Sequence, residues 1–124
     1  MAGQRVLVVE DNENNMKLFR DVLHATGYST LEAGTGEDAV ELAASHVPAL
    51  VLMDVQLPGI DGIEALARLR RDARTASIPV LAVTAQAMRG DRERFLEAGF
   101  DGYLSKPVDV LELVRAVEEY CGRE

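Results

Sequence analysis

The chain has 124 residues, a formal net charge of −8 and a hydrophobic content of 48%, which suits a single domain with its own core. The excess of acidic residues argues against direct nucleic-acid binding, because such binding relies on cations placed on phosphates. The single cysteine rules out an intramolecular disulfide and a cysteine-based metal cluster. The apolar runs are too short to insert into a membrane, and the first residues lack a signal-peptide core, so we expect a cytoplasmic protein.

Five apolar segments predict five strands. Residues 6–9, 50–53 and 80–83 are continuous apolar runs, typical of strands that are buried on both faces of a sheet. Residues 28–32 and 102–105 are weaker strand candidates.

Amphipathic segments lie between these strands. Apolar side chains recur at helical spacing at Met16, Phe19 and Leu23, at Ile63, Leu66 and Leu69, and at Val110, Val114, Val117 and Cys121. Asp109 is placed to cap the last of these helices, and Cys121 is expected to be a small core side chain. We interpret residues 68–71 as a solvated helix face. The alternation of strands and helices predicts an α/β fold with a five-stranded parallel sheet and helices on both faces.

Polar side chains stand where the predicted strands end. Glu10 and Asp11 follow the first strand, Asp54 follows the third, Thr84 the fourth and Lys106 the fifth. The carboxyl ends of parallel strands meet at one edge of a sheet, so these side chains should converge there.

Three neighbouring carboxylates repel one another unless a cation intervenes. Mg²⁺ suits such a group, because it is bound by a few carboxylates together with water and phosphate oxygens. Zinc fits poorly, since no cysteine follows a strand and His24 and His46 lie in helical segments. A carboxylate beside Mg²⁺, with a lysine and a hydroxyl opposite, suits phosphoryl transfer onto an aspartate.

Four segments resemble the response-regulator receiver domain of two-component signalling. They are residues 6–12, 52–62, 78–85 and 103–107, which occur in order and reach the predicted strand ends. The resemblance implies a (βα)5 flavodoxin-like fold, in which residues 1–124 form one receiver domain with no output domain. Two further segments, residues 11–19 and 85–91, resemble a single-domain member of this family.

The resemblance also implies a phosphorylation site and a magnesium site. Asp54 would accept a phosphoryl group from a sensor histidine kinase or a histidine phosphotransfer protein. Glu10, Asp11, Asp54 and the backbone carbonyl of Gln56 would bind Mg²⁺. Many family members have two aspartates where this chain has Glu10 and Asp11, and the longer Glu10 side chain suggests binding through water.

Three more residues have roles implied by the resemblance. Thr84 and Lys106 would hold the phosphoryl group, and Tyr103 would turn inward as an aromatic switch when Thr84 moves. A half-buried strand tyrosine also has a purely structural interpretation. The Lys106–Pro107 bond is expected to be cis, and Gln56 and Gln86 are expected to tune the lifetime of the phosphorylated state.

We therefore expect a signalling switch rather than an enzyme, although it would catalyse its own phosphorylation and slow dephosphorylation. It would act in cell-cycle or cell-division control by binding a downstream protein, as a monomer or as a phosphorylation-dependent dimer, without contacting nucleic acid or inserting into a membrane.

One alternative is a receiver excised from a hybrid kinase. Another is an aspartyl-phosphate phosphohydrolase, but the second carboxylate that such enzymes usually have two residues after the nucleophile is replaced by Gln56. A flavodoxin-like flavin carrier would need a phosphate loop that no strand end supplies.

Overall fold

Five parallel strands form the centre of the computed structural model, which describes residues 4–85 and 91–121. The strands are β1 (Arg5–Val9), β2 (Ser29–Ala33), β3 (Leu50–Asp54), β4 (Val80–Thr84) and β5 (Gly102–Ser105). Their order across the sheet is β2-β1-β3-β4-β5, and every neighbouring pair is parallel. The structure therefore confirms the predicted α/β fold.

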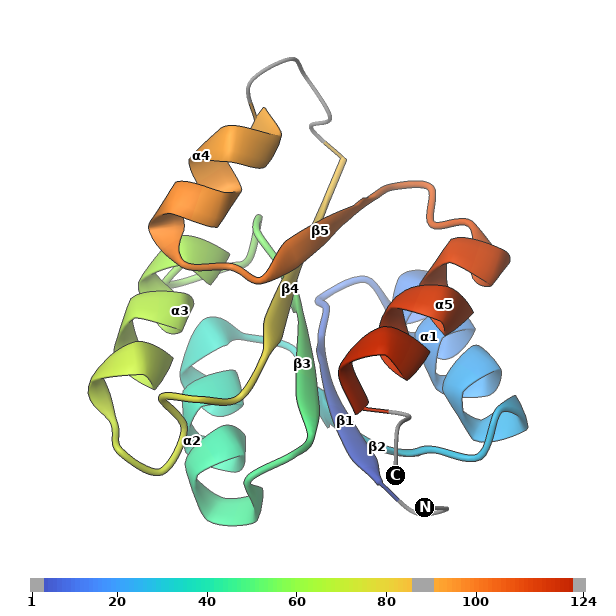
Figure 1. Ribbon diagram of the computed structural model, residues 1–124, viewed down its shortest axis with the longest axis horizontal. Coiled ribbons are helices and arrows are strands. Elements are labelled where there is room, and N and C mark those ends of the chain that lie inside the picture. Colours follow the sequence, from blue (N-terminus) through green and yellow to red (C-terminus); the bar gives the residue numbers. More distant parts are fainter. Residues whose placement is uncertain (1–3, 86–90, 122–124) are drawn as a thin grey trace.

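Helices cover both faces of this sheet, as Figure 1 shows. They are α1 (Glu13–Ala25), α2 (Gly36–His46), α3 (Gly62–Arg71), α4 (Asp91–Ala98) and α5 (Val110–Cys121). α1 and α5 lie on one face, and α2, α3 and α4 lie on the other (Figure 1).

Alternate strand residues fill two separate hydrophobic clusters. In β1, Val6 and Val8 pack with the residues of α1 and α5, whereas Leu7 and Val9 pack with those of α2, α3 and α4. All four are at most 1% exposed. This burial on both faces explains why the run is continuously apolar rather than alternating.

Short polar side chains begin several helices. Asn12 caps α1 by accepting a hydrogen bond from the N–H of Asn15, and Asp61 caps α3 in the same way. Asp109 accepts hydrogen bonds from the N–H groups of Leu111 and Glu112 at the start of α5, as predicted. These caps fix where α1, α3 and α5 leave the sheet edge.

The interpretation of residues 68–71 as a solvated face is wrong for two of the four residues. Leu69 is 1% exposed, because it lies on the same buried face of α3 as Leu66. The guanidinium of Arg70 donates hydrogen bonds to four acceptors: the backbone oxygens of Ala76, Ile78 and Gly99 and the carboxylate of Asp101. Only Arg68 and Arg71 match the expectation.

Cys121, at the end of α5, is buried as predicted.

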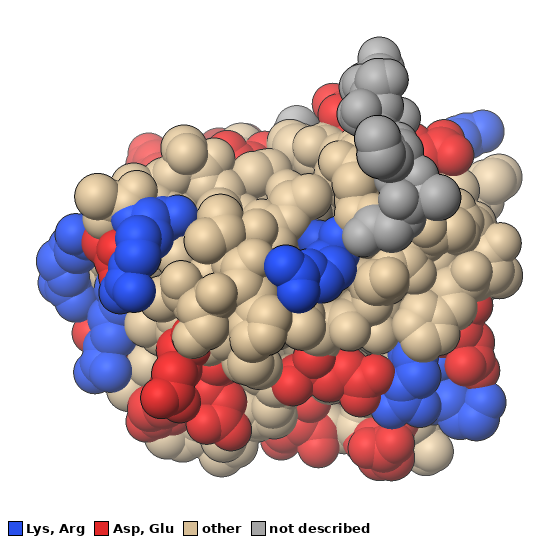
Figure 2. Space-filling model, turned by 90° about the horizontal axis from the view of Figure 1, so that it is seen from below, with Lys and Arg blue, Asp and Glu red and all other residues tan. Residues whose placement is uncertain are grey.

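The end of the molecule where the strands begin carries few charged side chains near its middle. Figure 2 shows this end: uncharged side chains cover much of it around one basic group near the centre, and most of the acidic side chains lie along one long side, with others at the edges. Polar residues of the opposite end are described below. No helix within residues 4–85 and 91–121 is long and apolar enough to cross a membrane.

Candidate functional site

The carboxyl ends of β1 and β3 bring three carboxylates together, as predicted. Asp54 is the last residue of β3, and Glu10 and Asp11 directly follow β1, which pairs with β3. Carboxylate oxygens of these three residues lie within 4.8 Å of one another. Glu10 and Asp54 are buried, with residue exposures of 3% and 4%, whereas Asp11 is exposed.

Both oxygens of Asp54 have partners. Oδ1 accepts a hydrogen bond of 3.0 Å from the backbone N–H of Gln56, and Oδ2 accepts one of 2.9 Å from Nζ of Lys106. Gln56 lies two residues along the turn that follows β3, and Lys106 directly follows β5. These bonds fix the orientation of the Asp54 carboxylate.

The two carboxylate oxygens of Glu10 differ in their hydrogen bonding within the described part of the chain: Oε2 accepts hydrogen bonds, and Oε1 does not. Oε2 accepts hydrogen bonds from the backbone N–H of Asn12 at 3.1 Å and from Nδ2 of Asn15 at 3.5 Å. Oε1 lies 3.0 Å from Nζ of Lys106, close enough for an ion pair, but it is buried and has no partner of hydrogen-bond geometry among the described residues. A buried carboxylate oxygen in that state is suited to accept a metal or a metal-bound water.

Lys106 is the cation of the site. Its side chain is 19% exposed and its Nζ contacts both Glu10 and Asp54. Burial acts to lower the pKa of Lys106, but the contacts with Asp54 and Glu10 outweigh it, so the pKa lies above its ordinary value. Lys106 therefore stays charged across the neutral range. The following Lys106–Pro107 bond is cis, as expected.

Thr84 and Tyr103 lie on neighbouring strands. Thr84 ends β4 and is 1% exposed, and its backbone oxygen accepts a hydrogen bond of 2.8 Å from the N–H of Lys106. Tyr103, in β5, is half-buried, and its ring packs against that of Phe95 in α4 at 6.1 Å between centroids. Thr84 thus belongs to the edge that holds the carboxylates, whereas Tyr103 lies between this edge and α4.

A shallow groove runs along β5, and Tyr103 contributes to its wall. The groove has a volume of about 660 Å³, and its lining includes Leu96 of α4, Ser105 of β5, and Arg115 and Tyr120 of α5. The sequence predicts that partners read the face formed by the fourth helix, the fifth strand and the fifth helix, and the groove lies on that face. The groove itself is not predicted, because its shape depends on how α4 and α5 flank the edge strand. Gln86, the other residue expected to tune the lifetime, lies outside the described residues.

Comparisons with known proteins agree with this geometry. Residues 6–118 match the family described as the response regulator receiver domain. The chain is 47% identical over 117 residues to the polar-differentiation response regulator DivK of Brucella ovis, covering 94% of this chain and 95% of that protein. DivK is the single-domain regulator that residues 11–19 and 85–91 resemble.

Solved structures show the same fold. The receiver domain of a sensor histidine kinase from Pseudomonas aeruginosa, solved with a magnesium ion coordinated in its active site cleft, has a TM-score of 0.90 and 37% identity, covering 98% of this chain and 99% of that one. The receiver domain of Ssk1 from Saccharomyces cerevisiae, solved in complex with the histidine phosphotransfer protein Ypd1, has a TM-score of 0.86 and 29% identity, covering 96% and 89%.

Proposed function

Because this chain belongs to the response regulator receiver domain family of two-component signalling, we propose that it is a switch controlled by phosphorylation of Asp54. The observation that carries the proposal is the environment of the Asp54 carboxylate. It is buried at a strand end, it is oriented by Gln56 and Lys106, and two more carboxylates lie within 4.8 Å. In this environment an oxygen of the Asp54 carboxylate would act as the nucleophile toward a donor at the edge of the sheet.

The proposed reaction transfers a phosphoryl group from a phosphohistidine. An oxygen of Asp54 forms a bond to phosphorus as the nitrogen–phosphorus bond breaks, and the departing imidazole keeps the electron pair of that bond. Lys106, already 2.9 Å from Oδ2, is placed to pair with an oxygen of the transferred group. The Thr84 hydroxyl would donate a hydrogen bond to another oxygen. These contacts position charge rather than move protons.

The site fits Mg²⁺. Glu10, Asp11, Asp54 and the carbonyl of Gln56 would hold the ion. Oε1 of Glu10 is buried with an ion pair to Lys106 but no hydrogen bond among the described residues, which supports a role for Glu10. Mg²⁺ would supply positive charge to the oxygens of the moving phosphoryl group. The similar Pseudomonas aeruginosa receiver domain contains such an ion in its cleft.

The signal would leave through contact with other proteins. Charge added at Asp54 would draw Thr84 toward it, and Tyr103 would then reposition against α4 and change the groove along β5. Sensor kinases, phosphotransfer proteins and a downstream target are the partners we propose, in cell-cycle or cell-division control. The 47% identity to DivK over 94% of this chain supports this role.

The decisive experiment is phosphorylation of the full chain by a small acyl phosphate in Mg²⁺. Asp54→Asn should abolish labelling, and a chelator should abolish labelling of the parent. Asp38→Asn is the matched control, because Asp38 is an exposed carboxylate in the first turn of α2. Labelling that persists in Asp54→Asn, or that is lost equally in Asp38→Asn, would overturn the proposal.

The switch needs a separate test. Partner affinity should change with a phosphoryl mimic in the parent and change less in Thr84→Ala and Tyr103→Ala. An equal change in all three proteins would show that the signal does not pass through Thr84 and Tyr103, even if Asp54 is phosphorylated.

A further inference from the structure

We propose that Glu37 is a positioning residue for the metal site, although it lies in α2 and outside the carboxylate cluster. It would act by holding the turn between β3 and α3, which carries Gln56. The inference rests on the proposed function, because it concerns the backbone carbonyl of Gln56 as a ligand for Mg²⁺.

The carboxylate of Glu37 lies against the tip of this turn. The backbone N–H of Ile60 donates a hydrogen bond of 3.4 Å to Glu37 Oε2. Gly59, which precedes Ile60, has a φ of 76°, and a Cβ built on it would lie 2.9 Å from the same carboxylate oxygen. Glycine is therefore favoured at this position by its positive φ, and its lack of a Cβ leaves room for the Glu37 carboxylate.

A second glycine brings the backbone of α2 close to the same turn. A Cβ built on Gly36 would lie 2.7 Å from Cγ1 and 3.0 Å from the backbone oxygen of Ile60. The absence of side chains at Gly36 and Gly59 thus lets the start of α2 lie close to the turn around Ile60. The first turn of α2 and the tip of the turn consequently pack as a unit, with Glu37 supplying the polar contact.

The base of the turn is closed as well. The N–H of Gly62 donates a hydrogen bond of 2.9 Å to the backbone oxygen of Val55, and a Cβ on Gly62 would lie 2.6 Å from the backbone oxygen of Asp54. Gln56 lies between this base and the tip, with its N–H bonded to Asp54. Because only three residues separate Gln56 from Ile60, we expect movement of the tip to shift the Gln56 peptide as well.

Loss of the Glu37 contact should therefore weaken metal binding without removing a ligand. Groups that orient metal ligands typically change affinity by about 10- to 100-fold when they are mutated. Glu37 acts through backbone and through a long hydrogen bond, so we expect the low end of that range. Glu37 is also a negative charge, and its effect through position must be separated from its effect through charge.

Three variants of the full chain separate these effects in a Mg²⁺ titration followed by NMR. Glu37→Ala should weaken Mg²⁺ binding by about tenfold. Glu37→Gln keeps an oxygen that can accept from Ile60, so it should restore most of the affinity although the charge is gone. Glu41→Ala removes an equal charge one turn further along α2, where the residue is exposed, and should bind like the parent.

A second readout uses the metal-free protein. Hydrogen exchange of the Ile60 amide should be faster in Glu37→Ala than in the parent and close to the parental rate in Glu37→Gln and Glu41→Ala. Parental Mg²⁺ affinity in Glu37→Ala would overturn the inference. Equal weakening in Glu37→Ala and Glu37→Gln would also overturn it, because that result would indicate charge rather than position.

Asp11→Asn distinguishes failure of this inference from failure of the proposed metal site. If Asp11→Asn binds Mg²⁺ like the parent, the metal site is wrong and the role of Glu37 is wrong with it. If Asp11→Asn loses binding while Glu37→Ala retains it, only the role of Glu37 is wrong.

Discussion

Lys106 lies 2.9 Å from Asp54, through Nζ and Oδ2, and the same Nζ is 3.0 Å from Oε1 of Glu10. One lysine thus offsets part of the charge of two buried carboxylates in the absence of a metal. Mutual repulsion within the carboxylate cluster is correspondingly smaller than the three acidic residues alone would suggest. The same lysine is the one proposed to pair with the phosphoryl group.

Removing this lysine should destabilise the metal-free protein. Lys106→Met leaves Glu10 and Asp54 buried beside each other without their cation, which should lower the free energy of unfolding by about 3 kcal/mol. Asp54→Asn added to Lys106→Met should recover part of that loss, because it removes one of the unpaired charges. Urea denaturation of the parent, both single variants and the double variant measures this coupling. Strictly additive effects would show that the two residues do not interact energetically.

The ion pair between Lys106 and Asp54 should also make the free energy of unfolding depend on pH in the alkaline range. The folded pKa of Lys106 is raised above its usual 10.5, so its contribution to stability is fully present below that value and is lost as pH rises through the folded pKa. Two half-buried tyrosines also titrate at alkaline pH, because partial burial raises the pKa of Tyr28 and of Tyr120 above the usual 10.0. The diagnostic quantity is therefore the difference in stability between the parent and Lys106→Met. That difference should shrink above about pH 10.5, and a difference that stays constant there would contradict the assignment.

Mg²⁺ should stabilise the folded protein by mass action. At a free concentration 100 times the dissociation constant, the expected gain is about 2.7 kcal/mol, seen as a higher melting temperature. Asp11→Asn should lose most of this gain, since it removes an exposed carboxylate from the cluster. The control is a monovalent salt at the same ionic strength. An equal rise with that salt would indicate general screening rather than a specific site.

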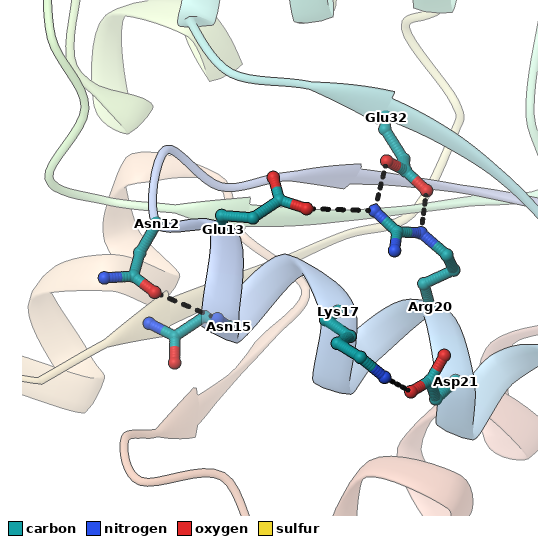
Figure 3. Close-up of polar contacts among 7 residues, drawn as sticks. All are labelled: Asn12, Glu13, Asn15, Lys17, Arg20, Asp21 and Glu32. Carbon is teal, nitrogen blue, oxygen red and sulfur yellow. Dashed lines mark hydrogen bonds and ion pairs between the residues drawn. The ribbon is translucent and has the colours of Figure 1, made fainter.

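A second ion pair, between Arg20 and Glu32 and drawn in Figure 3, should make the free energy of unfolding depend on pH in the acidic range. Nε and Nη2 of Arg20 in α1 bond the two oxygens of Glu32 in β2 at 2.6 and 2.9 Å, and Glu13 contacts the same guanidinium. The hydrogen bond from Arg20 is the main reason that the pKa of Glu32 is lowered. The stabilisation is present above the unfolded value near 4.5 and is lost as pH falls through the folded pKa.

The comparison that tests this pair is Glu32→Gln against the parent from pH 7 to pH 2. The parent should be slightly more stable at neutral pH, and the difference should disappear in acid. Glu41→Gln, an exposed change of the same kind, should show no such trend. A difference that persists in acid would mean that Glu32 acts through packing rather than through its charge.

The sheet and the strand-end residues could be predicted from the sequence because each depends on a local pattern. Runs such as residues 50–53 are apolar throughout because both faces of β3 are covered, and the residue after that run, Asp54, is then carried to the sheet edge. Once the strands are parallel, Glu10, Asp54 and Lys106 follow the ends of three different strands on one side.

The contacts between distant side chains could not be predicted in this way. The hydrogen bonds of Arg70 to four acceptors depend on how the ends of α3 and α4 approach each other, which no periodicity records. Glu37 is likewise an ordinary first-turn acidic residue in the sequence. Its contact with Ile60 depends on the close packing that Gly36 and Gly59 allow.

The bidentate contact between Arg20 and Glu32 has a further consequence for the outer side of β2. Within the part of the chain that the structure describes, this strand pairs with β1 alone and forms an edge of the sheet, so its other side could template a strand from another molecule. A charged pair that ties α1 to this strand makes such pairing unfavourable, because an incoming strand would have to remove water from both charges. Glu32→Val, which also breaks the contact with Arg20, should therefore increase the tendency of the protein to self-associate through β2.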